Sequence, residues 1–338
     1  MTNKNSNDFL TDHILKQQQE KDKVKFTAED FANITDINRV VEMYDKIKSY
    51  KEMVSQKMTF ITPGLTRLVP YTKENLYLFG AFSGAGKTTV SANIAYPLWK
   101  EGKNILWISN EENKEDIQMR LACIELGYNF NDYKKGYMSN EKIIKAAKLF
   151  PEIHKHVNIV DISDKDGITT KVEGVMNILE EANRSGKYSC VLIDYYQLIK
   201  YSVDNPQRST YQVLDDFRIF LMKFIKRSSI PVVLFCQLHS KQKRNNRELD
   251  SRIKDGPTIY EAATVIFEIL PEFHKSSTDL VIHKDRFGST GLRHKLGFEN
   301  GRFIDYTEEF SRKVASKDVD EMEAVVSKRI EESKSNGA

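Results

Sequence analysis

Long apolar runs are missing from this chain of 338 residues, and none approaches the roughly 18 residues that a membrane-spanning helix needs. Residues 1–23 also lack the apolar core of a secretory signal. Cysteine is rare, and Cys123, Cys190 and Cys236 show no spacing typical of a metal site. Because Cys190 and Cys236 fall in apolar, strand-like runs, we expect buried free thiols and a reducing, cytoplasmic compartment.

An excess of charge of one sign is missing as well. The formal net charge is only +3, which is too small to indicate a nucleic-acid partner, so the distribution of basic residues has to decide that question. Hydrophobic residues make up 40% of the chain and charged residues 29%, which is typical of a globular protein with a sizeable core. The sequence shows no internal repeat.

Composition and apolar spacing divide the chain into four parts. Residues 1–35 are polar and predict a disordered arm. The spacing over 36–59 predicts an amphipathic linker helix, packed either on its own domain or on a neighbouring subunit. Residues 60–306 predict the main folded domain, and residues 307–338 a charged tail.

Short apolar runs alternate with helical patterns in the main domain. The runs lie at 76–79, 105–108, 157–160, 190–193, 232–236, 265–270 and 280–282. Helical patterns separate the first five runs, and near-continuous apolar strands with helical crossovers indicate a parallel sheet covered on both faces. The predicted fold class is therefore α/β, with a mostly parallel sheet flanked by helices.

The clearest motif follows the first of these runs. Residues 81–88 fit the pattern of a small residue, four of any kind, then Gly-Lys-Thr, with Ala81 where glycine is commoner. Gly84 and Gly86 allow backbone N–H groups to turn toward phosphates, and the helix that follows presents its positive end to them. A strand before the turn and a helix after it favour a nucleotide site over an ordinary glycine-rich turn. The expected nucleotide-binding residues are Ala81, Ser83, Gly84, Ala85, Gly86, Lys87, Thr88 and Thr89.

Other polar residues follow neighbouring apolar runs and predict the remaining parts of an ATPase site. Asp194 ends the run 190–193, at the strand edge where ligands bind in open α/β sheets, and we assign it with the Thr88 hydroxyl to Mg²⁺. Glu111 or Glu112 is the expected base that activates water, and we favour Glu111. Gln237 is either an amide at the core edge or a sensor of the γ-phosphate.

Several ordered segments resemble the RecA-like motor domain of the DnaB-family replicative helicases across residues 60–306. These segments are ILWISNEENKEDIQMRLA, CVLIDYYQLI, IPVVLFCQLHS and HKDRFGSTG. The resemblance implies a RecA-like P-loop ATPase that uses ATP and Mg²⁺ and assembles as a homo-oligomeric, hexameric ring on single-stranded DNA. It also implies that Lys284 and Arg286 reach the ATP of the neighbouring subunit. The family's helical N-terminal domain is not seen, which is typical of a short phage or plasmid form in a host cytoplasm and leaves contacts with a primase or loader open.

The basic segment 239–257 comes directly after Gln237, where RecA-like motors place a loop that faces the central channel. A Lys/Arg run is usually a solvated loop, but this position favours contact with the phosphates of single-stranded DNA. A second, weaker candidate is 199–212, with Lys200 and Arg208. The expected DNA-binding residues are Lys241, Lys243, Arg244, Arg247, Lys254 and Gly256.

Together these patterns predict an ATP hydrolase that works as a ring-shaped DNA helicase motor, moving on single-stranded DNA and unwinding duplex. Two alternatives stay open. One is a RecA/RadA-type recombinase that forms a helical filament, and the other is a regulatory or scaffolding ATPase that unwinds nothing.

Overall fold

The computed structural model describes residues 58–161, 168–200, 209–239, 252–253, 258–272, 276–286 and 288–307. The predicted arm lies outside these ranges. Only residues 58 and 59 of the predicted linker helix and residue 307 of the predicted tail lie within them.

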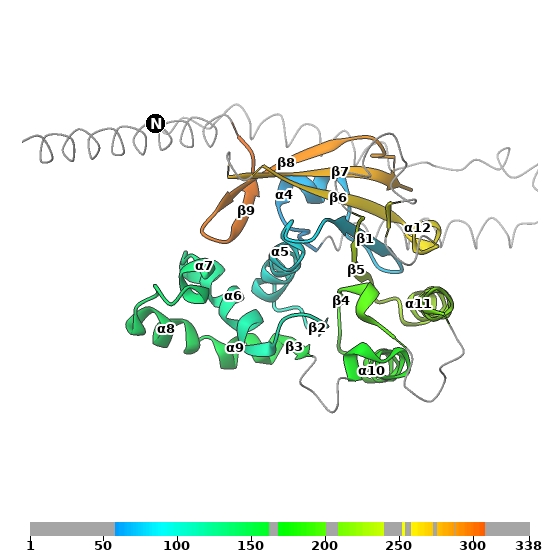
Figure 1. Cartoon of the computed structure of the whole chain (residues 1–338), viewed down its shortest axis with the longest axis horizontal. Helices are drawn as coiled ribbons and strands as arrows, with labels where there is room; N and C mark the ends of the chain where they lie inside the picture. The colour runs from blue at the N-terminus through cyan, green and yellow to red at the C-terminus, as the bar shows by residue number, and fades with distance from the viewer. Residues whose placement is uncertain are drawn as a thin grey trace, which may run out of the picture. The chain divides into compact units, whose positions relative to one another are not determined.

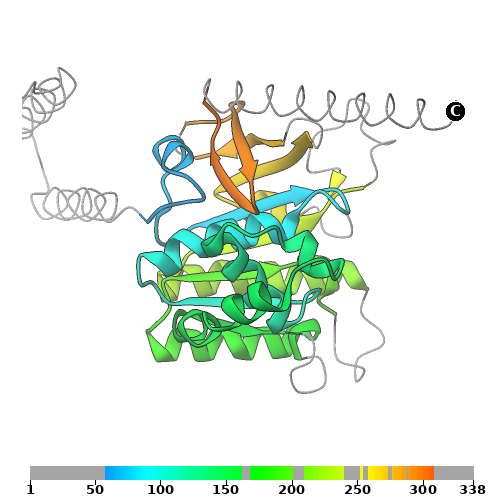
Figure 2. The ribbon, with the colours of Figure 1, turned by 90° about the vertical axis from the view of Figure 1, so that its left-hand side faces the viewer.

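One mixed sheet forms the centre of the described chain (Figure 1). Its strands are β1 (Leu76–Ala81), β2 (Ile105–Ser109), β3 (Val157–Val160), β4 (Cys190–Asp194), β5 (Val232–Gln237), β6 (Val265–Glu272), β7 (Ser277–Asp285), β8 (Arg293–Glu299) and β9 (Arg302–Asp305). Their order is β3-β2-β4-β5-β1-β6-β7-β8-β9. Neighbours from β3 to β6 are parallel, and the pairs from β6 to β9 are antiparallel. The orange β8–β9 hairpin thus extends the sheet beyond its parallel part (Figure 2).

Helices cover both faces of the parallel strands. Figure 1 shows α5 (Lys87–Lys100) and α6 (Lys114–Leu126) on one side, and α10 (Val172–Ser185) and α11 (Thr210–Ser228) on the other. The shorter helices are α4 (Pro63–Leu68), α7 (Phe130–Lys134), α8 (Asn140–Ala147), α9 (Phe150–His156) and α12 (Ile259–Ala262), with 3₁₀ turns η1 (Ile168–Thr170) and η2 (Tyr196–Leu198). None of these described helices is both long and apolar enough to span a membrane.

Local capping sets where the crossover helices begin and end. The Asn113 side chain accepts a hydrogen bond from the Asp116 backbone N–H at 2.8 Å and starts α6, and Gly127 ends it with a left-handed φ of 66°. Ser209 and Gln212 form a reciprocal capping box at the start of α11. These caps satisfy helix-end groups that have no partner within the helix itself.

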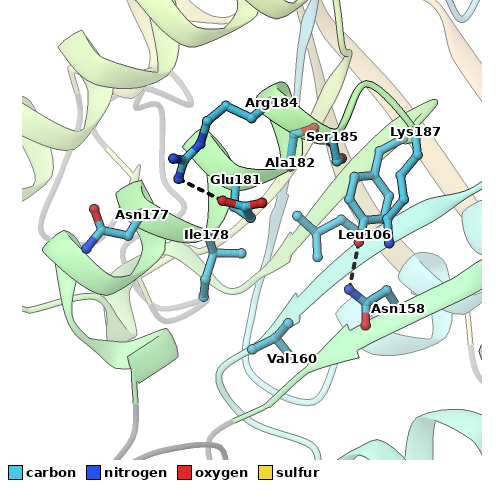
Figure 3. Close-up of a pocket in the computed structure, with 11 residues that line it drawn as sticks. Leu106, Asn158, Val160, Asn177, Ile178, Glu181, Ala182, Arg184, Ser185 and Lys187 are labelled. Carbon is cyan, nitrogen blue, oxygen red and sulfur yellow. Dashed lines mark hydrogen bonds and ion pairs between the residues drawn. The ribbon is translucent and has the colours of Figure 1, made fainter.

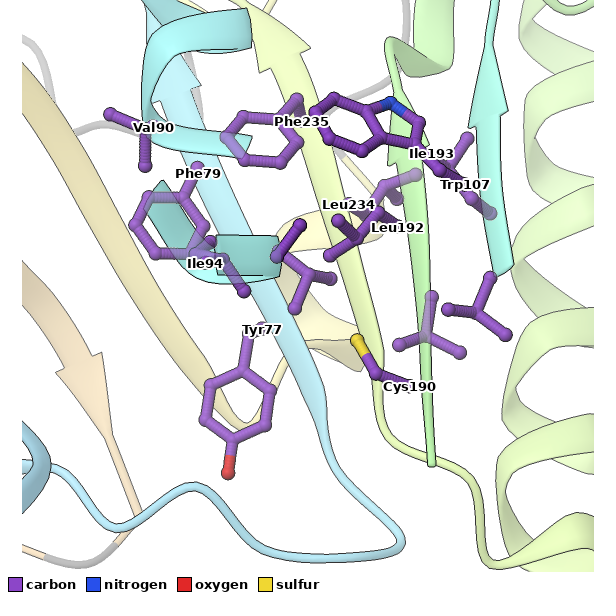
Figure 4. Close-up of a cluster of buried hydrophobic side chains, with 14 of the residues drawn as sticks. Tyr77, Phe79, Val90, Ile94, Trp107, Cys190, Leu192, Ile193, Leu234 and Phe235 are labelled. Atoms are coloured by element: carbon purple, nitrogen blue, oxygen red, sulfur yellow. The ribbon is translucent and has the colours of Figure 1, made fainter. Parts of the chain in front are cut away.

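The core lies against the parallel strands, which are buried on both faces because helices lie on each side. The Phe79 ring stacks between Phe235 and Phe267, with centroid distances of 5.2 and 4.6 Å. Figure 4 shows Phe79 and Phe235 in the same buried cluster as Val90 and Ile94 of α5. All three cysteines are buried free thiols, as expected for Cys190 and Cys236.

The α/β fold with a mostly parallel sheet is confirmed, and the seven predicted apolar runs coincide with β1 to β7. Strands β8 and β9 were not predicted. Each has few buried apolar side chains, with Leu296 in β8 and Phe303 in β9 fully or almost fully buried. Such strands give little alternation of apolar and polar residues to recognise.

Candidate active site

Four parallel strands end at one edge of the sheet. Ser109 at the end of β2 pairs with Asp194 at the end of β4, and Ala81 at the end of β1 pairs with Gln237 at the end of β5. The turns that leave these strands therefore lie side by side. This carboxyl edge is where open α/β sheets bind ligands.

The turn after β1 has the backbone of an anion site. Gly84 and Gly86 have positive φ values of 73° and 91°, in the left-handed region that glycine adopts at little cost. Gly86 is the N-cap of α5 and brings no side chain to cap its first N–H groups. Lys87 begins the helix and is only 8% exposed. Unpaired N–H groups and the positive end of a 14-residue helix therefore meet beside one lysine, which favours an anionic ligand.

Asp194 is 1% exposed and lies next to this turn. Its Oδ2 accepts a hydrogen bond from the Ser91 hydroxyl at 3.3 Å, whereas its Oδ1 is buried with no hydrogen-bond partner in the described part of the chain. Burial raises the pKa of the Asp194 carboxyl to about 6, although a hydrogen bond from Thr88 and the charge of Lys87 oppose the rise. A buried oxygen without a partner is costly, so this carboxylate is suited to a cationic ligand.

The residue after Asp194 forms one wall of the same site. The ammonium of Lys87 lies over the Tyr195 ring, 4.7 Å from its centroid. Burial raises the pKa of the Tyr195 hydroxyl, and the charges of Glu111 and Asp194 raise it further. Lys87, Glu111 and Asp194 are therefore electrostatic neighbours at this edge.

The two adjacent glutamates after β2 have different surroundings. Glu112 pairs with Arg120 of α6 at 2.5 Å, and the Arg120 guanidinium lies over the Phe130 ring at 4.0 Å. Arg120 also donates to the Thr89 hydroxyl at 3.5 Å. Glu111 is exposed, and its charge contributes to the raised pKa of Asp194. The structure thus engages Glu112 in an ion pair and leaves Glu111 accessible beside Asp194.

Gln237 is half-buried, and its backbone is held by a residue that the sequence did not single out. The Gln237 N–H donates to Oε1 of Gln197, and the Gln197 Nε2 donates to the Gln237 carbonyl oxygen, both at 2.9 Å. Forty residues separate the two, so no local pattern could indicate this contact.

Lys284 and Arg286 lie away from the phosphate turn of their own chain. Asp285 pairs with Val265 at the start of β6, and the Arg286 N–H donates to the Thr264 carbonyl oxygen at 3.2 Å. This is the amino edge of β1 and β6, opposite to the edge that carries Lys87.

The side chains of these two residues differ in their surroundings. Lys284 donates to the carbonyl oxygens of Tyr260 and Glu261, each at 3.0 Å, and burial, with the charge of Arg286, lowers its pKa. Arg286 is exposed. The predicted site residues therefore form two groups, one at each edge of the sheet.

The basic segment is described only near its ends. Lys241, Lys243, Arg244, Arg247, Lys254 and Gly256 lie outside the described residues, as does Arg208. Lys200 is described and exposed. Leu238 forms a β-bridge with Ile253, and the His239 N–H donates to the Arg252 carbonyl oxygen at 2.8 Å, so the two ends of the segment are paired.

Arg252 differs from the expectation for a basic residue of this segment. It is 6% exposed, and its guanidinium donates to both carboxylate oxygens of Glu268 at 2.7 and 2.8 Å. The Nε2 of His283 lies 2.8 Å from the same carboxylate. Burial by itself raises the pKa of the Glu268 carboxyl, but hydrogen bonds from His283 and Arg252, with their charges, lower it to about 2 on balance. Arg252 therefore anchors the end of the segment to β6 and is not available to a phosphate.

A cavity of about 420 Å³ lies between α10 and the outer strands β2 and β3 (Figure 3). Leu106, Val160 and Ile178 contribute apolar surface, and Asn158, hydrogen-bonded to the Tyr188 hydroxyl, lies at its side. Its lining includes none of the phosphate-turn residues, so it is separate from the candidate site.

Comparison with known proteins decides the family. The family model described as DnaB-like helicase C terminal domain matches residues 64–307. The chain belongs to this family. Membership makes the described domain a helicase-type ATPase domain that binds ATP, and the chain an ATP hydrolase.

Solved structures share the fold of this DnaB-like domain. The ATPase domain of a phage helicase superposes with a TM-score of 0.65 at 20% identity, covering 80% of this chain and 98% of that one. A DnaB-like replicative helicase, described with its interactions with primase, gives a TM-score of 0.65 at 20% identity, covering 89% and 77%. At such identities the likeness concerns the fold alone.

A curated protein also matches a short part of this DnaB-like chain. DNA repair protein RadA of Campylobacter jejuni is 41% identical over 51 residues, which are 15% of this chain. The match spans only 11% of the length of RadA.

The Glu268 cluster gives a prediction about stability and pH. Glu268→Gln removes the carboxylate that neutralises buried Arg252, and we expect the free energy of unfolding at pH 7 to fall by about 3 kcal/mol. The folded pKa of about 2 lies below the ordinary value of 4.5, so the carboxylate stabilises the fold above pH 4.5 and this contribution is lost as the pH falls toward 2. Urea unfolding of both proteins from pH 7 down to the lowest pH at which they fold measures a difference that shrinks with pH.

The control for this prediction is Glu272→Gln. Glu272 pairs with Lys295 at 2.7 Å where both side chains are about one-third exposed, so its loss costs at most about 1 kcal/mol. Equal losses in the two variants, or a difference independent of pH, contradict the role given to Glu268.

Proposed function

We propose that this chain is the motor of a ring-shaped, ATP-driven DNA helicase that moves along single-stranded DNA and unwinds duplex. The observation that carries the proposal is the placement of the phosphate turn, Asp194 and Glu111 at one edge of a DnaB-like domain. We propose the cytoplasm as its compartment, that of a host cell if the chain is phage-encoded, and a primase or helicase loader as its protein partner. The last suggestion rests on the DnaB-like helicase described with its interactions with primase.

The residues of the phosphate turn and its surroundings fit ATP with Mg²⁺. The turn from Ala81 to Thr89 would hold the phosphates through its N–H groups, and Lys87 would reach the β- and γ-phosphates. The partnerless Oδ1 of Asp194 and the nearby Thr88 hydroxyl are hard oxygen ligands of the kind that Mg²⁺ takes, through water in the case of Asp194. Bound there, Mg²⁺ supplies positive charge to the phosphates.

Glu111 is the residue that we propose orients and deprotonates the attacking water. It is exposed beside Asp194, whereas Glu112 is held by Arg120 and thereby fixes the turn to α6. Gln237 is proposed as the sensor of the γ-phosphate, at the end of the strand that pairs with β1.

Lys284 and Arg286 are proposed to act on the ATP of the neighbouring subunit. Both lie at the edge of the sheet opposite to their own phosphate turn, so a role in their own site would require reaching across β1. Arg286 is exposed, and its planar guanidinium stays charged and can contact two phosphate oxygens. Hydrolysis would then depend on assembly into a ring.

The basic segment after Gln237 is proposed to contact the DNA backbone through Lys241, Lys243, Arg244, Arg247 and Lys254, with Gly256 in the same stretch. What supports this is its position directly after β5 and the pairing of its ends at Leu238 and Ile253. Contacts of this kind are electrostatic and independent of base sequence.

A recombinase that forms a filament is the second candidate, and the short RadA match favours it. A helicase ring closes on itself, whereas a filament continues along DNA. Electron micrographs with ATP and single-stranded DNA distinguish the two assemblies.

Strand separation tests the proposed function. We expect the wild-type chain to unwind a forked DNA duplex with ATP, measured by release of a fluorescent strand. Lys87→Ala removes the charge held over the transferred phosphate, and we expect ATP hydrolysis to fall at least about 100-fold and unwinding to stop, with an unchanged circular dichroism spectrum. DNA-stimulated hydrolysis without strand separation would support a regulatory or recombinase ATPase instead.

The two glutamates allow a matched comparison. Glu111→Gln keeps the size of the side chain but removes the base, so we expect the turnover number to fall by about 10²–10⁴ with ATP affinity retained. Glu112→Gln weakens the contact with Arg120 and lowers turnover much less. Single-turnover hydrolysis and equilibrium ATP binding measure both variants, and a reversed order assigns the base to Glu112.

Subunit mixing tests the role of Arg286. Arg286→Ala is expected to bind ATP but to lose about 10³-fold or more of its DNA-stimulated hydrolysis. Mixed with inactive Lys87→Ala subunits, it regains activity because each Lys87→Ala neighbour supplies an intact Arg286 to a complete phosphate turn. The control Arg293→Ala removes an exposed arginine paired with Asp279 and keeps wild-type turnover. Full activity of Arg286→Ala on its own would rule out the role in trans.

A further inference from the structure

The ladder between β4 and β5 stops before β5 does. Its last paired residues are Ile193 and Leu234, whereas β5 continues along β1 as far as Gln237. The Leu238 N–H donates to the Ala81 carbonyl oxygen at 2.8 Å, toward β1. Because peptide groups alternate sides along a strand, those of Gln237 face the side where β4 has already ended.

The side chain of Gln197 occupies this position. Its amide carries one acceptor and a donor group, like a peptide, and it exchanges two hydrogen bonds of 2.9 Å with the N–H and C=O of Gln237. Gln197 is 8% exposed and lies in η2, three residues after Asp194. A side-chain amide thus takes the place of the next residue of β4 in the ladder.

The segment that bears Gln197 is also tied to β2. The Asn110 N–H donates to the Asp194 carbonyl oxygen at 2.7 Å, and the Asn110 side-chain amide donates to the Tyr195 carbonyl oxygen at 3.2 Å. Asn110 directly precedes Glu111, and the Tyr195 ring lies under Lys87. Hydrogen bonds therefore run without interruption from the turn that bears Glu111, through residues 194–197, to Gln237.

We propose that Gln197 is a positioning residue that couples the ATP edge of the sheet to the backbone of Gln237 and the segment that follows it. It touches no nucleotide and acts through Gln237. A shift of Asp194 or Tyr195 with the state of the nucleotide is passed to Gln237 because the two amide bonds fix the distance between them. This coupling rests on the proposed function, in which Gln237 senses the γ-phosphate and the following residues meet DNA.

Gln197→Glu separates coupling from stability. Glutamate keeps the length of the side chain and the acceptor for the Gln237 N–H, but it presents a carboxylate oxygen to the Gln237 carbonyl in place of a donor. Gln197→Ala removes both bonds. The control is Gln212→Ala, which also removes a side-chain amide bonded to a backbone N–H, that of Ser209 at 2.9 Å, but at the start of α11.

The experiment measures steady-state ATP hydrolysis of the full chain with and without single-stranded DNA, together with ATP binding and thermal unfolding. In Gln197→Glu we expect the stimulation of kcat by DNA to fall by about tenfold, a typical size for coupling between two sites. Its KM for ATP and its rate without DNA stay close to wild type. Gln197→Ala shows the same loss of stimulation, and Gln212→Ala shows none.

Two results would overturn the coupling role. Wild-type stimulation in both Gln197 variants contradicts it directly. Equal losses with and without DNA, in step with a lower unfolding temperature, reduce Gln197 to a structural residue. A wild-type chain whose hydrolysis does not respond to DNA contradicts the proposed function itself, and the coupling with it, so the failures are distinguishable.

Discussion

The parallel ladder from β2 through β4 and β5 to β1 decides where every polar group of the candidate site lies. Because Ser109 pairs with Asp194 and Ala81 pairs with Gln237, the four strands end at a common edge. The apolar residues before these ends are buried on both faces, so a slip by one residue would bring polar strand ends into the core. Packing of the strands thus fixes the spacing of the charges beyond them.

Within this frame, helix α6 divides the work between two neighbouring glutamates. Arg120 binds Glu112, packs its guanidinium on Phe130 and reaches Thr89, the third residue of α5. One arginine therefore ties the turn after β2 to the first turn of the phosphate helix. The two parts of an ATP site that lie on different elements are held together by a contact that involves neither Lys87 nor Asp194.

Local parts of the fold and site could be predicted from the sequence, whereas contacts between distant segments could not. The phosphate turn follows from the spacing of Gly84, Gly86 and Lys87, and the apolar run before Asp194 placed that residue at a strand end. The amide of Gln197 gains its role only because β4 ends early, which no composition reveals. Arg252 looks like its basic neighbours until β6 brings Glu268 against it.

The described sheet ends on both sides in a four-residue strand, β3 at one edge and β9 at the other. Short edges offer few free backbone groups to a second copy, and β9 also begins with Arg302 and ends with Asp305. Copies of this chain would then associate through side chains and turns rather than by continuing one sheet across a boundary. Such contacts can tighten at one boundary and loosen at the next within the same assembly, which an unbroken ladder between subunits would forbid.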